Sequence, residues 1–62
     1  MYELISIGRD EVRRVELCAY SRKPLNDYLF DNGYFWSKTK NRFVRKGGFS
    51  WFEYVVEKIK NK

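Results

Sequence analysis

The scarcity of cross-linking residues is the feature that most limits what this chain can fold into. Its 62 residues include one Cys and no His, so neither an internal disulfide nor a structural zinc site has enough ligands. A domain of this size buries only about 60% of the surface that its unfolded chain exposes. We therefore expect one compact domain over residues 1–62, without cofactor or metal, that depends on aromatic packing, self-association or a bound partner.

Apolar residues are frequent but do not form long runs. They make up 44% of the chain, which argues against disorder. The longest apolar run, Leu17 to Tyr20, is far too short for a membrane span or a signal peptide. We expect a soluble cytoplasmic protein that makes no membrane contact.

An N-terminal β-hairpin is predicted from two alternating segments. Residues 2–7 read as a strand, residues 8–11 as its turn, and residues 12–20 alternate well enough to pair back. A helix beginning at Asp10 is the competing interpretation, and we favour the strand. Pairing Ile7 with Val12 then places one apolar set on a single face: Tyr2, Leu4, Val15, Leu17 and Ala19.

One short helix is predicted over about 24–32. Pro24 suits the first helical position, with Ser21 as a nearby capping hydroxyl. Gly33 suits the left-handed position that ends a helix. Its apolar stripe, Leu25, Tyr28 and Leu29, is too narrow for an isolated helix, so the helix must pack on a sheet.

Three further strands, 34–38, 42–46 and 49–59, are expected to form an antiparallel meander. Gly47-Gly48 predicts a two-residue hairpin turn that pairs Phe43 with Phe52 and Arg42 with Glu53. The preceding loop leaves two alternatives open for Trp36. A three-residue loop places it beside Val44 on a mixed face, and a four-residue loop places it on the core face.

Together these elements predict an α+β fold with a helix packed on one face of the sheet. It consists of an N-terminal hairpin, one short helix and a three-stranded antiparallel meander. The predicted core residues are Leu4, Val15, Leu17, Leu25, Leu29, Phe43, Phe52, Tyr54 and Val56. Unpaired sheet edges, or the second aromatic face, make a homodimer a further expectation, with the charged end of strand 49–59 protecting that edge.

The positive charge is concentrated in one segment. The chain has 13 Lys and Arg against 8 Asp and Glu, yet no acidic residue lies between Asp31 and Glu53. The same interval is rich in aromatic residues. Cations interleaved with rings are typical of single-stranded nucleic-acid platforms, in which cations contact phosphates and rings stack on bases. The alternative is that the rings form the core and the charges a solvated rim.

We therefore predict a non-enzymatic nucleic-acid-binding module, for DNA or RNA, single-stranded or duplex. Its predicted binding residues are Trp36, Lys38, Lys40, Arg42, Arg45, Lys46, Phe49 and Trp51. The alternative is a small adaptor or inhibitor that docks on a protein, such as a nucleic-acid enzyme, because exposed rings with a basic rim suit that role equally well. Its small size and high aromatic content suggest an accessory protein of a virus or mobile element.

Catalytic chemistry finds no support in the sequence. No His accompanies the serines or Cys18, and no phosphate-binding glycine loop precedes a helix. Asp27 and Asp31 are expected on a solvated helix face. Cys18 is expected to be a buried, inert thiol.

Overall fold

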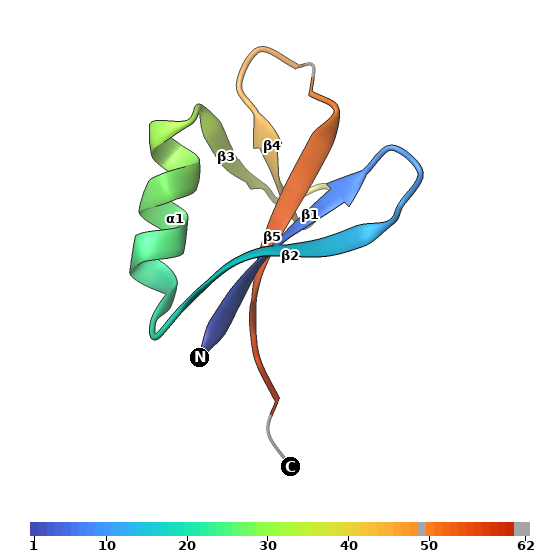
Figure 1. Cartoon of the computed structure of the whole chain (residues 1–62). Coiled ribbons are helices and arrows are strands. Elements are labelled where there is room, and N and C mark those ends of the chain that lie inside the picture. Colours follow the sequence, from blue (N-terminus) through green and yellow to red (C-terminus); the bar gives the residue numbers. More distant parts are fainter. Residues whose placement is uncertain (49, 61–62) are drawn as a thin grey trace.

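A computed structural model describes residues 1–48 and 50–60. The chain forms an α+β single domain with five antiparallel strands and one helix (Figure 1), as predicted. The elements, in chain order, are β1 (Tyr2–Gly8), β2 (Arg13–Ala19), α1 (Arg22–Asp31), β3 (Tyr34–Ser37), β4 (Arg42–Arg45) and β5 (Phe52–Lys58).

The strands form one sheet in the order β2-β1-β5-β4-β3. The last strand therefore lies at the centre, paired with β1 along its whole length and with β4 at Phe43–Tyr54. This overturns the expectation that the 49–59 segment is a sheet edge protected by its charges. The edges are β2 and β3, so a homodimer formed by edge pairing would use one of these two strands.

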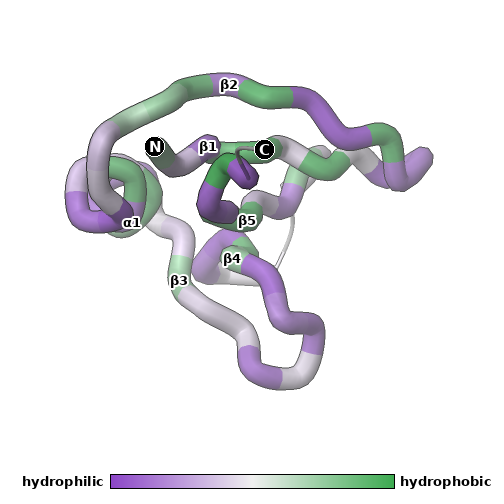
Figure 2. The backbone as a smooth tube through the Cα atoms, turned by 90° about the horizontal axis from the view of Figure 1, so that it is seen from below, coloured by the Kyte–Doolittle hydropathy of each residue, from purple (hydrophilic) through white to green (hydrophobic). Residues whose placement is uncertain are grey.

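The helix lies over one face of the sheet between the two edge strands. Figure 2 looks along α1 and shows its apolar positions turned toward the strands. Leu25 and Leu29 of the helix pack there against the sheet. Together α1 and the sheet bury one cluster: Leu4, Leu25, Leu29, Phe43 and Val56. Burial of this cluster is the main favourable term available to so small a domain.

The helix begins two residues earlier than predicted. Ser21 occupies the N-cap position in an extended conformation, but its side chain makes no capping hydrogen bond, and Pro24 is the third helical residue rather than the first. Proline remains compatible with this position because the first-turn amides have no intrahelical acceptor. The predicted end holds, since Asn32 caps the helix and Gly33 follows with φ of 85°.

A β-bulge explains the main error in the N-terminal hairpin. β2 is a strand, as favoured, but Leu4 pairs with Leu17 and Ile5 pairs with Val15, which leaves Glu16 as an extra residue. The bulge moves Val15 to the face opposite Leu4. Val15 and Leu17 are both exposed on this edge strand, and the predicted register of Ile7 with Val12 is wrong.

Two buried hydrophobic residues were missing from the predicted core. Ile5 and Ile7 are buried on the face away from α1, and Ile5 lies between Val55 and Val15 of the neighbouring strands. Because the sheet buries both faces of β1, its alternating pattern underestimates the core.

The turn between β4 and β5 is longer than a two-residue hairpin. Gly47 and Gly48 do adopt positive φ, 101° and 93°, but β4 ends at Arg45 and β5 begins only at Phe52. The register is therefore shifted by two residues from the predicted pairing of Phe43 with Phe52. Phe52 lies beyond the pairing with β4 and is exposed instead of belonging to the core, while Tyr54 packs against the core cluster.

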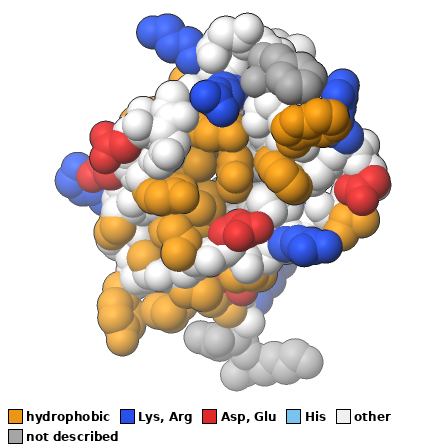
Figure 3. Space-filling view, turned by 45° about the horizontal axis from the view of Figure 1, so that its top comes forward, with side chains coloured by type: hydrophobic (Ala, Val, Ile, Leu, Met, Phe, Trp, Pro, Cys, Tyr) orange, Lys and Arg blue, Asp and Glu red, His pale blue; other side chains and the backbone are white. Residues whose placement is uncertain are grey.

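Many large hydrophobic side chains remain accessible. Figure 3 shows them gathered across the middle of one face, with acidic and basic side chains among and around them. Tyr28, Phe30 and Trp36 are each about half exposed. A thin core leaves such surface, and contiguous exposed apolar surface marks interaction sites.

Candidate functional site

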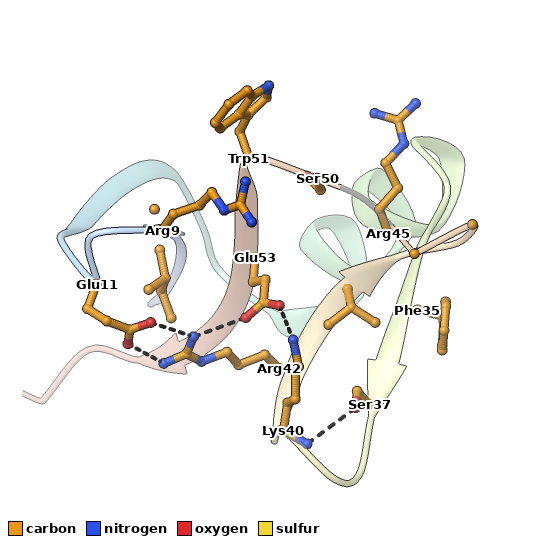
Figure 4. Close-up of a pocket in the computed structure, with 15 residues that line it drawn as sticks. Arg9, Glu11, Phe35, Ser37, Lys40, Arg42, Arg45, Ser50, Trp51 and Glu53 are labelled. Atoms are coloured by element: carbon orange, nitrogen blue, oxygen red, sulfur yellow. Dashed lines mark hydrogen bonds and ion pairs between the residues drawn. The ribbon is translucent and has the colours of Figure 1, made fainter.

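An open groove of about 700 Å³ lies on the side of the sheet away from the core cluster. It is lined by the β1–β2 turn, by β3 and β4, and by the connection from β4 to β5 (Figure 4). The groove thus collects residues that are up to 46 positions apart in the chain, from Ile7 near one end to Glu53 near the other.

The floor of the groove is an ion-pair network centred on Arg42. Its guanidinium lies 2.8 Å from the Glu11 carboxylate and 3.0 Å from the Glu53 carboxylate. Lys40 donates to the other oxygen of Glu53 at 2.8 Å. Figure 4 shows these side chains pointing toward one another. The network neutralises two of the cations that the sequence offered as phosphate ligands.

The network fixes the ionisation of its members. The hydrogen bond from Lys40, with that from Arg42, lowers the pKa of Glu53. The hydrogen bond from Arg42 lowers the pKa of Glu11, and the two carboxylates together raise the pKa of Arg42. Both acids are therefore charged at neutral pH and act as hydrogen-bond acceptors only.

Two tight turns bring the network together. In the β1–β2 turn, Glu11 has φ of 66°, its amide donates to the Gly8 carbonyl at 2.9 Å, and the Asp10 carboxylate accepts from the Val12 amide at 3.0 Å. Before β4, Asn41 has φ of 57° and its amide donates to the Ser37 carbonyl at 2.8 Å. Asp10 favours the first turn because its side chain bonds locally, and Asn41 suits the second because Asn tolerates the left-handed region.

The walls of the groove are aromatic and basic. Trp51 is 63% exposed, and the Arg9 guanidinium lies 5.4 Å from the centre of its ring. Phe35, also about half exposed, and Val44 contribute from β3 and β4. Figure 4 shows Arg45 standing at the margin opposite Trp51 and Arg9. The groove is therefore a site with ring faces at its sides and guanidinium groups at its rim.

Ser50 anchors the segment that carries Trp51. Its hydroxyl lies 3.0 Å from the Tyr34 hydroxyl, accepts from the Phe52 amide at 3.2 Å and lies 2.8 Å from the Phe52 carbonyl oxygen. Tyr34 in turn packs edge-on against Tyr54, with ring centres 4.9 Å apart. Burial, with a contribution from Tyr34, raises the pKa of Tyr54 to about 12. The start of β5 is thereby tied to the aromatic packing on the helix side.

The predicted binding residues that the structure describes divide into three groups. Lys40, Arg42, Arg45 and Trp51 line the groove, whereas Lys38 and Lys46 are exposed outside its lining. Trp36 lies on the other face: the four-residue loop 38–41 pairs it with Phe43, and their rings meet edge-on at 5.2 Å. Its inclusion in one surface with Trp51 is therefore wrong. Phe49 lies outside the described residues.

Sequence reasoning missed several groove residues. Arg9 and Glu11 were not among the predicted binding residues, because their distance along the chain from Arg42 concealed that the β1–β2 turn meets β4. Phe35 was not among them either. Strand alternation contained that signal, because Phe35 and Trp36 are consecutive and must point to opposite faces.

Cys18 is exposed, which corrects its expected burial. It lies on the edge strand β2, opposite Glu3. Within residues 1–48 and 50–60, no three His, Cys, Asp or Glu side chains are grouped closely enough to hold a metal ion, and no helix there has the length and apolar character needed to cross a membrane.

Comparison with known proteins adds no assignment. No protein-family model, curated protein or solved structure matches this chain. The groove is thus the basis on which a function can be argued.

Proposed function

We propose that this chain is a non-enzymatic nucleic-acid-binding module that uses the groove. The observation that carries the proposal is the pairing of exposed rings with cations across a single depression: Trp51 and Arg9 on one wall, Phe35 and Arg45 on the other. Ring faces stack on bases, and guanidinium groups bind phosphates. Nucleic acid is a partner that uses both at once.

The ion pairs indicate which cations are available to contact phosphates. Lys40 and Arg42 are held by Glu11 and Glu53. Among the described residues, no acidic side chain lies within 4.0 Å of Arg45, Lys46 or Lys38. We assign phosphate binding to these three exposed cations rather than to all five basic residues of the segment.

Binding should consequently have a modest salt dependence. Three phosphate contacts give a slope of log affinity against log salt of about −2 for a single strand. Titration of a fluorescent oligonucleotide at several salt concentrations measures this slope. Arg45→Glu and Lys46→Glu should each flatten it by about 0.7, the contribution of one phosphate contact. Lys58→Glu is the matched control, because Lys58 ends β5 far from the groove.

The same titration decides the proposal. Absence of binding by the wild-type protein at low salt would overturn it. Binding that Lys58→Glu weakens as much as Arg45→Glu would show attraction by net charge alone, without use of the groove. Circular dichroism of each variant separates loss of contacts from loss of fold.

A specific observation supports a second candidate, docking on a protein. Tyr28, Phe30 and Trp36 are about half exposed on the helix side, away from the groove. Phe30 and Trp36 both pack edge-on against Phe43, at 6.0 and 5.2 Å between ring centres. Supported, partly exposed rings are typical of interaction hot spots. An adaptor or inhibitor would use this patch, and a partner captured independently of nuclease treatment should be lost in Trp36→Ala.

A further inference from the structure

The charged side chains of the groove are distributed unevenly, and this distribution distinguishes bases from phosphates. Its acidic lining residues, Glu11 and Glu53, lie at the floor, where both are bound to Arg42. Arg45 stands at the rim, and Lys46 follows it in the chain. At the floor a phosphate would meet two charged carboxylates and the two cations, Arg42 and Lys40, that are already paired with them. At the rim it would meet Arg45 and Lys46, which have no acidic side chain within 4.0 Å among the described residues, and this difference favours a backbone that passes outside the groove.

The walls require a ligand whose flat faces are open. Trp51 and Phe35 both line the groove and are 63% and 46% exposed. In a duplex each base is stacked on both sides, so its faces cannot reach such rings. A single strand can turn its bases out and stack them on aromatic side chains.

The floor offers acceptors to the bases that enter. Glu53 uses one oxygen for Lys40 and the other for Arg42, yet each carboxylate oxygen has a second lone pair. Its side chain keeps 22% of its surface exposed. An exocyclic amino group of a base can donate to such an oxygen, whereas a carbonyl at the same position of the base would be repelled by it.

From these three features we infer that the groove binds single-stranded nucleic acid with its bases turned inward and its backbone over the rim. Glu53 then selects bases that carry an exocyclic amino group over bases that carry a carbonyl in its place. This inference rests on the proposed function. It adds that the nucleic acid is single-stranded, that its bases point into the groove, and that Glu53 determines which bases are preferred.

Cytosine and thymine oligonucleotides give a matched pair of ligands. Both are single-stranded pyrimidine runs of equal charge, and they differ at the base position where cytosine has an amino group and thymine a carbonyl. We expect dodecamers of cytosine to bind about fivefold more tightly than dodecamers of thymine at neutral pH, the effect of one ordinary hydrogen bond. A duplex dodecamer should bind more weakly than either and leave the Trp51 fluorescence unquenched.

The variant Glu53→Gln tests the selecting residue. An amide can donate as well as accept, so the preference for cytosine should fall to near equality. Glu57→Gln is the matched control, because Glu57 lies on the same strand and pairs with Arg13 outside the groove. If Glu53→Gln proves unstable, the wild-type ratio of the two affinities and the duplex comparison still decide the question.

The possible results separate this inference from the proposed function. Equal binding of cytosine and thymine strands, or duplex binding as tight as single-strand binding, would overturn the inference and leave nucleic-acid binding intact. No binding of any oligonucleotide at low salt would overturn both. Preference for cytosine that persists in Glu53→Gln would retain the inward orientation of the bases but remove Glu53 as its reader.

Discussion

The two faces of the sheet are built from the same alternating strands but are closed in different ways. On one face α1 covers Leu4, Phe43 and Val56, and the helix supplies fully buried Leu29. The other face has no helix. Ile5 and Ile7 are buried there by the sheet's own neighbours and turns, and beyond them lies the open groove with its ion pairs. The helix-covered face supplies stability, and the uncovered face is left available for a ligand.

The largest difference between the faces should appear in stability. Leu29→Ala removes a fully buried side chain and should cost about 2–5 kcal/mol. Val44→Ala, on the half-buried groove wall, should cost about 1 kcal/mol. Urea denaturation followed by circular dichroism measures both.

A domain of this size has a total stability of about 3–9 kcal/mol, so Leu29→Ala can unfold it outright. Leu29→Met, which conserves volume, should then cost less than about 1.5 kcal/mol and keep the comparison measurable. Equal losses for Leu29→Ala and Val44→Ala would contradict the assignment of stability to the helix-covered face.

The two tryptophans extend the comparison to binding. Trp51→Ala should weaken single-strand binding by about 1–3 kcal/mol at every salt concentration, with little change in the unfolding midpoint, since the ring is largely exposed. Trp36→Ala should leave binding unchanged and cost about 1 kcal/mol of stability through its lost contact with Phe43. Oligonucleotide titration and thermal unfolding of both variants measure the two effects. Weakened binding in Trp36→Ala alone would assign the interface to the helix side.

The ion pairs of the groove floor should make the stability of the fold depend on pH in the acidic range. The pKa values of Glu11 and Glu53 are lowered in the fold from an ordinary value of 4.5. A lowered carboxyl pKa contributes stability that is fully present above the unfolded value and is lost as the pH falls through the folded value. The urea midpoint should therefore stay level from pH 7 to about 5 and decrease below 4.5.

Replacing one acid tests the origin of that decrease. Glu53→Gln should lower the midpoint at pH 7 and make its decrease in acid shallower, because one of the two linked carboxylates is gone. Glu57→Gln controls for the removal of one negative charge from the same strand. A decrease in acid that is identical in wild type and Glu53→Gln would assign it to groups outside the network.

The sequence was a good guide to the elements and a poor guide to the residues that meet across them. Hydrophobic alternation, Pro24 and Gly33 placed the strands and the helix because these signals act over a few neighbouring residues. The bulge at Glu16 and the long connection before Phe52 were not visible in the pattern. Each shifted a register and turned a predicted core residue outward.

Contacts between residues far apart in the chain limited the prediction of the site in the same way. The interval from Asp31 to Glu53 contains no acid, which indicated an uncompensated positive surface. The central position of β5 and the β1–β2 turn nevertheless bring Glu53 and Glu11 to Arg42. Four of the eight predicted binding residues line the groove, Lys40, Arg42, Arg45 and Trp51, because local charge and aromaticity were read correctly even where their partners were not.

Cys18 should show the smallest effect, because it belongs to neither the helix-side cluster nor the groove lining. It is exposed on the edge strand β2, so Cys18→Ser leaves no cavity and no buried polar group. Its stability should stay within about 0.5 kcal/mol of wild type, and oligonucleotide binding should be unchanged. The folded protein should also react with a thiol reagent as readily as it does in urea, since access needs no unfolding. A thiol that reacts only after denaturation would mean that a second surface covers β2, and light scattering would then distinguish a dimer joined at this edge from a monomer.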